Sequence, residues 1–152
     1  MPAQHAAFLR ALSLLSLASG LFALARGHAG LAPVPLAVCA TSVLYWREPL
    51  AASWLRALDI AVVQAGLSLQ SLAALRGAEY QAEYFALLAV GLAAFPLGVL
   101  LDRRARSRGE SSAAATLLHA AVHVFGNLAN VALYSGAVPP LFDQSPPPLV
   151  SL

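Results

Sequence analysis

Long apolar runs, separated by short clusters of charged residues, constrain this chain more than any other feature. Five runs occur, at residues 8–25, 30–46, 57–75, 84–101 and 113–134. Each has 17 to 22 residues, and about 20 apolar residues in a helix cross a hydrocarbon core of about 30 Å. The connections are short, so neighbouring helices must run antiparallel. The sequence therefore predicts an all-α, polytopic transmembrane helix bundle of about five spans, as a single domain over residues 1–135.

Composition agrees with a lipid bilayer as the surroundings of the chain. Of its 152 residues, 59% are hydrophobic and 11% are charged, whereas a soluble domain has about 25% charged residues. The segment 136–152 carries Pro139-Pro140 and Pro146-Pro147-Pro148, which exclude a regular helix and predict an extended tail. The first run has an alternative interpretation, because Ala23-Leu24-Ala25 resembles a signal-peptide cleavage site.

The distribution of arginine predicts how the bundle is oriented. With five spans, one side of the membrane receives seven arginines and the other receives only Arg26 and Arg76. The seven are Arg10, Arg47, Arg56, Arg103, Arg104, Arg106 and Arg108. Because basic residues accumulate on the cytoplasmic side of membrane proteins, the N-terminus is expected on a cytoplasmic-type side and the C-terminus opposite.

Several functions are excluded by the residues that the chain lacks. It has nine basic residues, all arginine, so a lysine Schiff base and a phosphate-binding P-loop are both ruled out. Cys39 is the single cysteine, so neither an internal disulfide nor a cysteine-based metal motif can form. No feature points to a nucleic-acid partner. The expected partners are the bilayer and other membrane subunits. The chain is expected to lie in a membrane as an integral, multi-pass protein.

The last apolar run carries a polar stripe. His119, His123, Asn127 and Asn130 are spaced by 4, 4 and 3 residues, so they fall within about 80° of one another around a helix. Polar groups at bilayer depth face a bundle interior or a wet cavity, because exposure to lipid is costly. Hydrogen bonds to other helices are the simplest explanation of the stripe. Gln64 and Gln70 on the third run are the expected partners, and Gln70 is expected to share the buried polar surface.

Asp59, at the start of the third run, is the other informative polar residue. It either stays at the interface beside Arg56 or faces the bundle interior. Ser42, Asp59, His119 and His123 lie at similar depths from the arginine-rich side, about 5 to 17 Å. They would therefore converge if the second, third and fifth helices adjoined. The two histidines at i, i+4 are also spaced as in helical zinc sites, although a catalytic zinc usually has three protein ligands.

These residues resemble a known family. Ser42 near a helix end, Leu58-Asp59 opening the next helix and His119-Ala-Ala-Val-His123 in the last helix are similar to motifs of the CREST superfamily, which includes alkaline ceramidases and progestin and adipoQ receptors. The resemblance implies a zinc held by His119 and His123, with Asp59 and Ser42 as catalytic residues. The family has seven spans and a third histidine four positions after the serine, where this chain has Trp46.

Three functions follow as hypotheses. The first is a small integral membrane protein without catalysis of its own, serving as a subunit or accessory of a larger membrane complex. The second is a CREST-like, metal-dependent hydrolase of a lipid amide or ester that uses His119, His123 and Asp59. The third is a small oligomeric transporter or proton pathway along the polar stripe.

Overall fold

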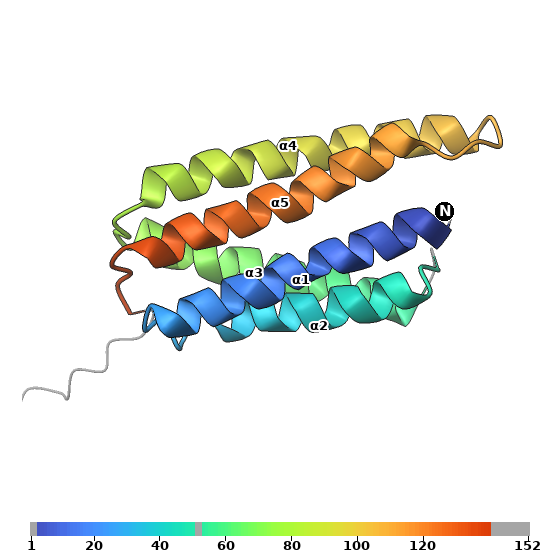
Figure 1. Ribbon diagram of the computed structural model, residues 1–152. Coiled ribbons are helices and arrows are strands. Elements are labelled where there is room, and N and C mark those ends of the chain that lie inside the picture. Colours follow the sequence, from blue (N-terminus) through green and yellow to red (C-terminus); the bar gives the residue numbers. More distant parts are fainter. Residues whose placement is uncertain (1–2, 51–52, 141–152) are drawn as a thin grey trace, which may run out of the picture.

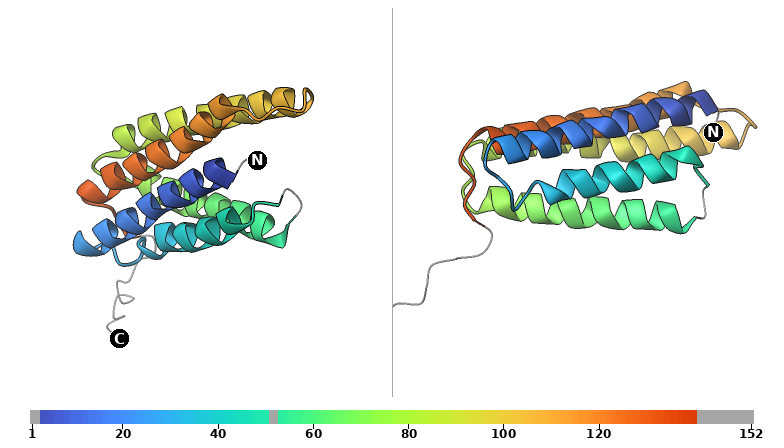
Figure 2. Two further views of the ribbon diagram at one scale, coloured as in Figure 1. Left: turned by 45° about the vertical axis from the view of Figure 1, so that its right-hand side comes forward. Right: turned by 60° about the horizontal axis from the view of Figure 1, so that its bottom comes forward.

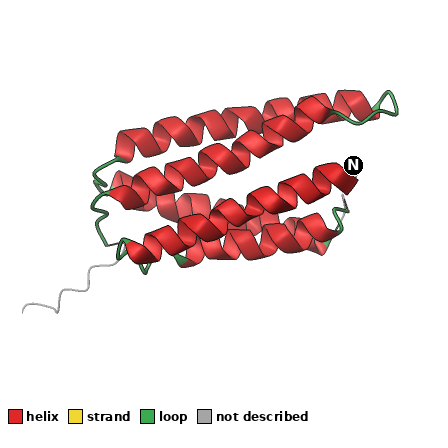
Figure 3. Cartoon of the chain, in the orientation of Figure 1, coloured by secondary structure: helices red, strands yellow, loops and turns green. Residues whose placement is uncertain are grey.

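The computed structural model describes residues 3–50 and 53–140, and within them it contains five helices and no strand (Figure 1, Figure 3). The helices are α1 (Ala3–Ala25), α2 (Pro33–Arg47), α3 (Trp54–Leu75), α4 (Gln81–Arg106) and α5 (Ala113–Ser135). The predicted all-α bundle is confirmed. Of the predicted tail, residues 141–152 lie outside the described residues. The part before them follows α5 without a helix, and Ala137 exchanges hydrogen bonds with Glu79.

Local sequence signals set the helix ends. Ser53 and Ser112 are the N-caps of α3 and α5, and their hydroxyls accept hydrogen bonds from the backbone N–H groups of Arg56 and Ala115. Glycines with positive φ follow three of the helices, as expected where a helix ends in a left-handed residue. They are Gly27 after α1, Gly77 after α3 and Gly109 after α4.

Four of the helices, α1, α3, α4 and α5, are long and apolar enough to cross a membrane. Their outer faces carry large apolar side chains that are 50% to 64% exposed, among them Leu14, Leu21, Leu72, Phe95 and Leu117. A bilayer covers such a surface, and these features indicate a multi-pass membrane protein. The second expected span differs from the other four. Helix α2 has only 15 residues, which corresponds to about 22 Å.

The five helices form an open ring. Neighbours in space follow the order α3, α2, α1, α5, α4, and the two ends of this series, α3 and α4, touch only sparsely. Figures 1 and 2 show α4 and α5 side by side, apart from α2 and α3. Successive helices alternate in direction, so the start of α1 and the α2–α3 and α4–α5 connections lie at one end of the bundle. We call this the arginine-rich end, because the seven arginines of the predicted basic side belong to it.

Small residues let the helices of the ring approach closely. Ser13, Ser16, Ser19 and Gly20 form the buried face of α1, and such faces are typical of membrane helix contacts. A Cβ atom at Gly20 would lie 2.6 Å from Cδ2 of Leu36 on α2. Opposite the arginine-rich end, Tyr84 and Tyr134 are fully buried among alanines and leucines from α1, α3, α4 and α5. The larger buried apolar cluster of the described residues therefore lies at that end, which we call the closed end.

Candidate functional site: a cavity between the two sides of the bundle

A cavity of about 320 Å³ lies inside the ring. Residues of α2 and α3 line one side, and residues of α4 and α5 line the other. At the closed end the hydroxyls of Ser71 on α3 and Tyr84 on α4 are 3.2 Å apart. Beyond this contact the cavity wall passes through Ile60, Leu92 and Phe95, whose side chains are 43% to 50% exposed. The exposed part of the cavity wall therefore lies between α3 and α4.

A hydroxyl–carboxylate cluster joins the cavity walls of α2 and α3. The hydroxyls of Ser42 and Thr41, consecutive on α2, both donate to Oδ1 of Asp59, at 2.6 Å and 2.9 Å. Ser42 is 2% exposed, whereas Asp59 is half-buried and lines the cavity with it. Of the two interpretations of Asp59, this geometry favours the bundle interior. Both bonds end on Oδ1, so Oδ2 of Asp59 receives neither of them.

The two histidines lie on the α5 wall of the same cavity. Their ring centroids are 5.3 Å apart, and the ring of Trp46 from α2 meets His119 edge-on at 5.2 Å. Within residues 3–50 and 53–140, neither imidazole makes a hydrogen bond. The Trp46 indole N–H is buried and also lacks an acceptor among the described residues. Within the described residues, ring contacts rather than hydrogen bonds therefore position the side chains of His119 and His123.

The two asparagines of the stripe have different surroundings. Asn127 is 9% exposed, accepts a hydrogen bond of 2.7 Å from Ser19 on α1 and donates one to the backbone oxygen of His123. Asn130 is half-buried and lines the cavity, and its amide has no hydrogen-bond partner in the described part of the chain. Asn127 thus fastens α5 to α1, whereas Asn130 presents an unsatisfied amide to the cavity.

Hydrogen bonds at the closed end connect the elements that surround the cavity. The side chain of Gln70, 3% exposed, donates to the hydroxyl of Tyr134 at 2.6 Å. The ring of His28, in the α1–α2 connection, lies 3.1 Å from the backbone oxygen of Tyr134. These contacts tie α3, α5 and the α1–α2 connection together, so that end of the cavity is fixed.

All of the predicted site residues line this one cavity: Ser42, Asp59, Gln70, His119, His123, Asn127 and Asn130. Their predicted roles stay predictions. The expected partners of the stripe were wrong for Asn127, because its amide bonds to Ser19 on α1 and to the backbone oxygen of His123, whereas Gln70 bonds to Tyr134 on α5. Sequence reasoning also missed Thr41, the second hydroxyl on Asp59. Thr41 adjoins Ser42, but a Thr-Ser pair is too common in helices to single it out.

The zinc implied by the family resemblance does not fit the residues present. His119 and His123 would supply two ligands, and Trp46, at the place of the third histidine, has no metal-binding atom. Within the described ranges, no three side chains of His, Cys, Asp or Glu lie close enough together to hold a metal ion. A catalytic zinc site usually has three protein ligands. Asp59 is instead engaged by two hydroxyls.

A scan against protein-family models found no matching family, and searches of curated proteins and of solved structures also found no match. The resemblance to the CREST superfamily therefore rests on its short motifs alone.

Proposed function

We propose that this chain is a small integral membrane protein that binds an amphipathic molecule from the bilayer in its central cavity, without catalysing a reaction. One observation carries the proposal: polar side chains without partners in the described residues line a cavity whose exposed wall lies between two apolar helices, α3 and α4. His119, His123 and Asn130 are the three on α5. An accessory membrane protein that holds or presents such a molecule needs no catalytic machinery.

The chemistry of the wall indicates what kind of ligand fits. Most lining residues are apolar, with a few polar groups between them, which is typical of small-molecule sites. Unpaired polar groups at bilayer depth are costly, so a ligand with hydroxyl or amide groups is stabilised there. Its apolar part would contact Leu88, Leu92 and Phe95 on α4. A lipid-like molecule with a hydrogen-bonding head meets both requirements.

The shape of the cavity supports entry from the membrane. The exposed part of the wall between α3 and α4 is apolar. At the closed end of the bundle, the Gln70–Tyr134 hydrogen bond connects α3 to α5. A path across the whole bundle would have to pass that pair, which does not favour the transporter hypothesis. In the proposed orientation, the arginine-rich end faces the cytoplasmic-type side, and the C-terminus is opposite.

Replacing Asn130 by leucine should reduce the amount of bound amphiphile about fivefold, the equivalent of one lost hydrogen bond of about 1 kcal/mol. Asn130 makes no hydrogen bond within the described residues, so the change removes a polar contact to the ligand while leaving the helix contacts intact. The measurement is mass spectrometry of organic extracts from protein purified out of native membranes. Ser68→Leu makes a similar change on the exposed face of α3 and should retain the ligand. Equal ligand content in the wild type and Asn130→Leu would contradict the proposal.

A hydrolase of a lipid amide or ester is the second candidate, because Ser42, Asp59 and the two histidines line one cavity. Because no third His, Cys, Asp or Glu completes a ligand set with the two imidazoles in the described residues, purified protein should contain well under one zinc per chain. Inductively coupled plasma mass spectrometry after dialysis against micromolar zinc measures this. One equivalent of zinc that is lost in His119→Ala would overturn the non-catalytic proposal in favour of the hydrolase.

A further inference from the structure

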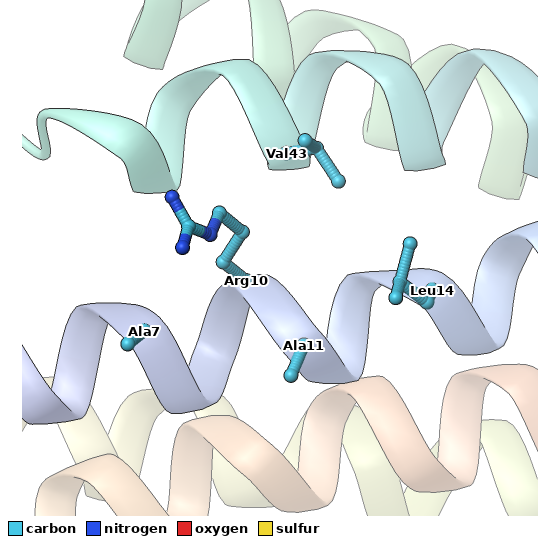
Figure 4. A pocket seen from close by; sticks show the side chains of 5 residues that line it. All are labelled: Ala7, Arg10, Ala11, Leu14 and Val43. Carbon is cyan, nitrogen blue, oxygen red and sulfur yellow. The ribbon is translucent and has the colours of Figure 1, made fainter.

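A second depression lies on the outer face of the bundle, between α1 and α2 (Figure 4). It measures about 280 Å³ and is lined by Ala7, Arg10, Ala11, Leu14 and Val43. We call it the α1–α2 groove. Four of its five residues are apolar, and Arg10 is the fifth. In Figure 4, Leu14 and Val43 point towards one another, and the Arg10 side chain extends towards the end of α2. The groove thus combines an apolar stretch with one cation nearer the arginine-rich end.

Arg10 differs from the paired arginines at the same end of the bundle. Arg106 forms an ion pair with Asp102 at 2.6 Å, and Arg108 forms one with Glu110 at 3.2 Å. Arg10 has no ion pair or side-chain hydrogen bond within residues 3–50 and 53–140. Long arginine side chains near helix ends extend along apolar surface to place the guanidinium among lipid headgroups. A counter-charge for Arg10 is therefore available from the membrane.

We propose that the α1–α2 groove binds one anionic phospholipid, with its phosphate on the Arg10 guanidinium and an acyl chain over Leu14 and Val43. Guanidinium groups form paired hydrogen bonds to phosphate oxygens. Leu14 is one helical turn farther from the arginine-rich end than Arg10, which is the direction in which an acyl chain runs from its headgroup. This site is separate from the central cavity, and it does not depend on the function proposed there.

Arg10→Gln should remove a preference for anionic lipid. In native mass spectrometry of detergent-solubilised protein with equal dioleoyl-phosphatidylglycerol and dioleoyl-phosphatidylcholine, the first bound lipid in the wild type should be mainly phosphatidylglycerol. One basic residue near a membrane surface contributes about 1 kcal/mol, which corresponds to about a fivefold preference. Arg10→Gln should lose it. Arg104→Gln is the matched control, because it removes the same charge at the same end of the bundle but away from the groove.

The lipid chain is tested separately from the charge. Leu14→Asn keeps Arg10 and should weaken the first phosphatidylglycerol adduct, because the acyl chain loses its apolar contact. An equal loss of preference in Arg10→Gln and Arg104→Gln would overturn the proposal in favour of a general basic surface. Displacement of the lipid by millimolar inorganic phosphate would overturn it in favour of a free-anion site. Unchanged thermal midpoints for the exposed Arg10→Gln and Leu14→Asn changes establish that both variants are folded.

Discussion

Replacing Gly20 by leucine should destabilise the bundle by about 2 kcal/mol or more. A Cβ atom at this position would lie 2.6 Å from Cδ2 and 2.7 Å from Cγ of Leu36, and 3.4 Å from the backbone oxygen of Ala32. The nearest atoms include the branch point of Leu36, so a rotation of its methyl groups does not relieve the overlap. Overpacking of a close interface typically costs about 1–3 kcal/mol. The two helices would have to separate, and the contact between α1 and α2 would weaken.

The measurement is the thermal midpoint of purified protein in detergent, followed by circular dichroism and by size-exclusion recovery after heating. Gly126→Leu is the matched control, because a Cβ atom at Gly126 meets nothing within 4 Å. Compared in ligand-free protein, that variant should keep or raise the midpoint, since leucine favours a helix over glycine by somewhat under 1 kcal/mol. A Gly20→Leu protein as stable as the wild type would show that α1 and α2 do not pack as described.

The second large effect is expected for Gly126→Leu, which should reduce the amount of bound ligand. Gly126 lines the central cavity on α5, between the histidines and Asn130. A leucine side chain there would occupy part of a space of about 320 Å³. Bound amphiphile should therefore fall about tenfold, the equivalent of about 1.4 kcal/mol of lost affinity, while the fold persists. Extraction and mass spectrometry of the purified variant measure the loss.

The control for this change is Ala93→Leu, which enlarges an exposed residue of α4 and should keep the ligand. Undiminished ligand in Gly126→Leu would place the bound molecule outside the cavity. A thermal midpoint below that of the ligand-free wild type would point instead to a damaged fold, because loss of a bound ligand alone lowers the midpoint of the loaded protein. Both variants replace a glycine by leucine. Gly20→Leu tests helix packing and Gly126→Leu tests ligand binding, so the two effects are measured separately.

The helices were predictable because apolar runs of membrane length leave few other folds. Their ends were less so. The fourth run was expected at residues 84–101, whereas α4 extends over Gln81–Arg106. Hydropathy ends where charge begins, but helical hydrogen bonding continues through Asp102 and Arg106, which pair across one turn. The signal for the end was Gly109, whose positive φ follows α4.

The site was predictable in its residue types but not in its pairings. Spacing alone placed the histidines and asparagines on one face of α5. Which helix meets that face depends on the order of helices around the ring, and a single sequence does not encode that order in any local pattern. For this reason Ser19 was missed as the partner of Asn127, and Thr41 as the second hydroxyl on Asp59.

The short helix α2 has a consequence for the membrane around it. Its 15 residues correspond to about 22 Å, against a hydrocarbon thickness of about 30 Å. A short apolar segment is accommodated by local thinning of the bilayer, at a cost of fractions of a kcal/mol per Å of mismatch. A bilayer that covers α2 would therefore be thinner there than beside α4. The bundle presents an uneven hydrophobic belt, and thin membranes should accommodate it at a lower cost than thick, sterol-rich ones.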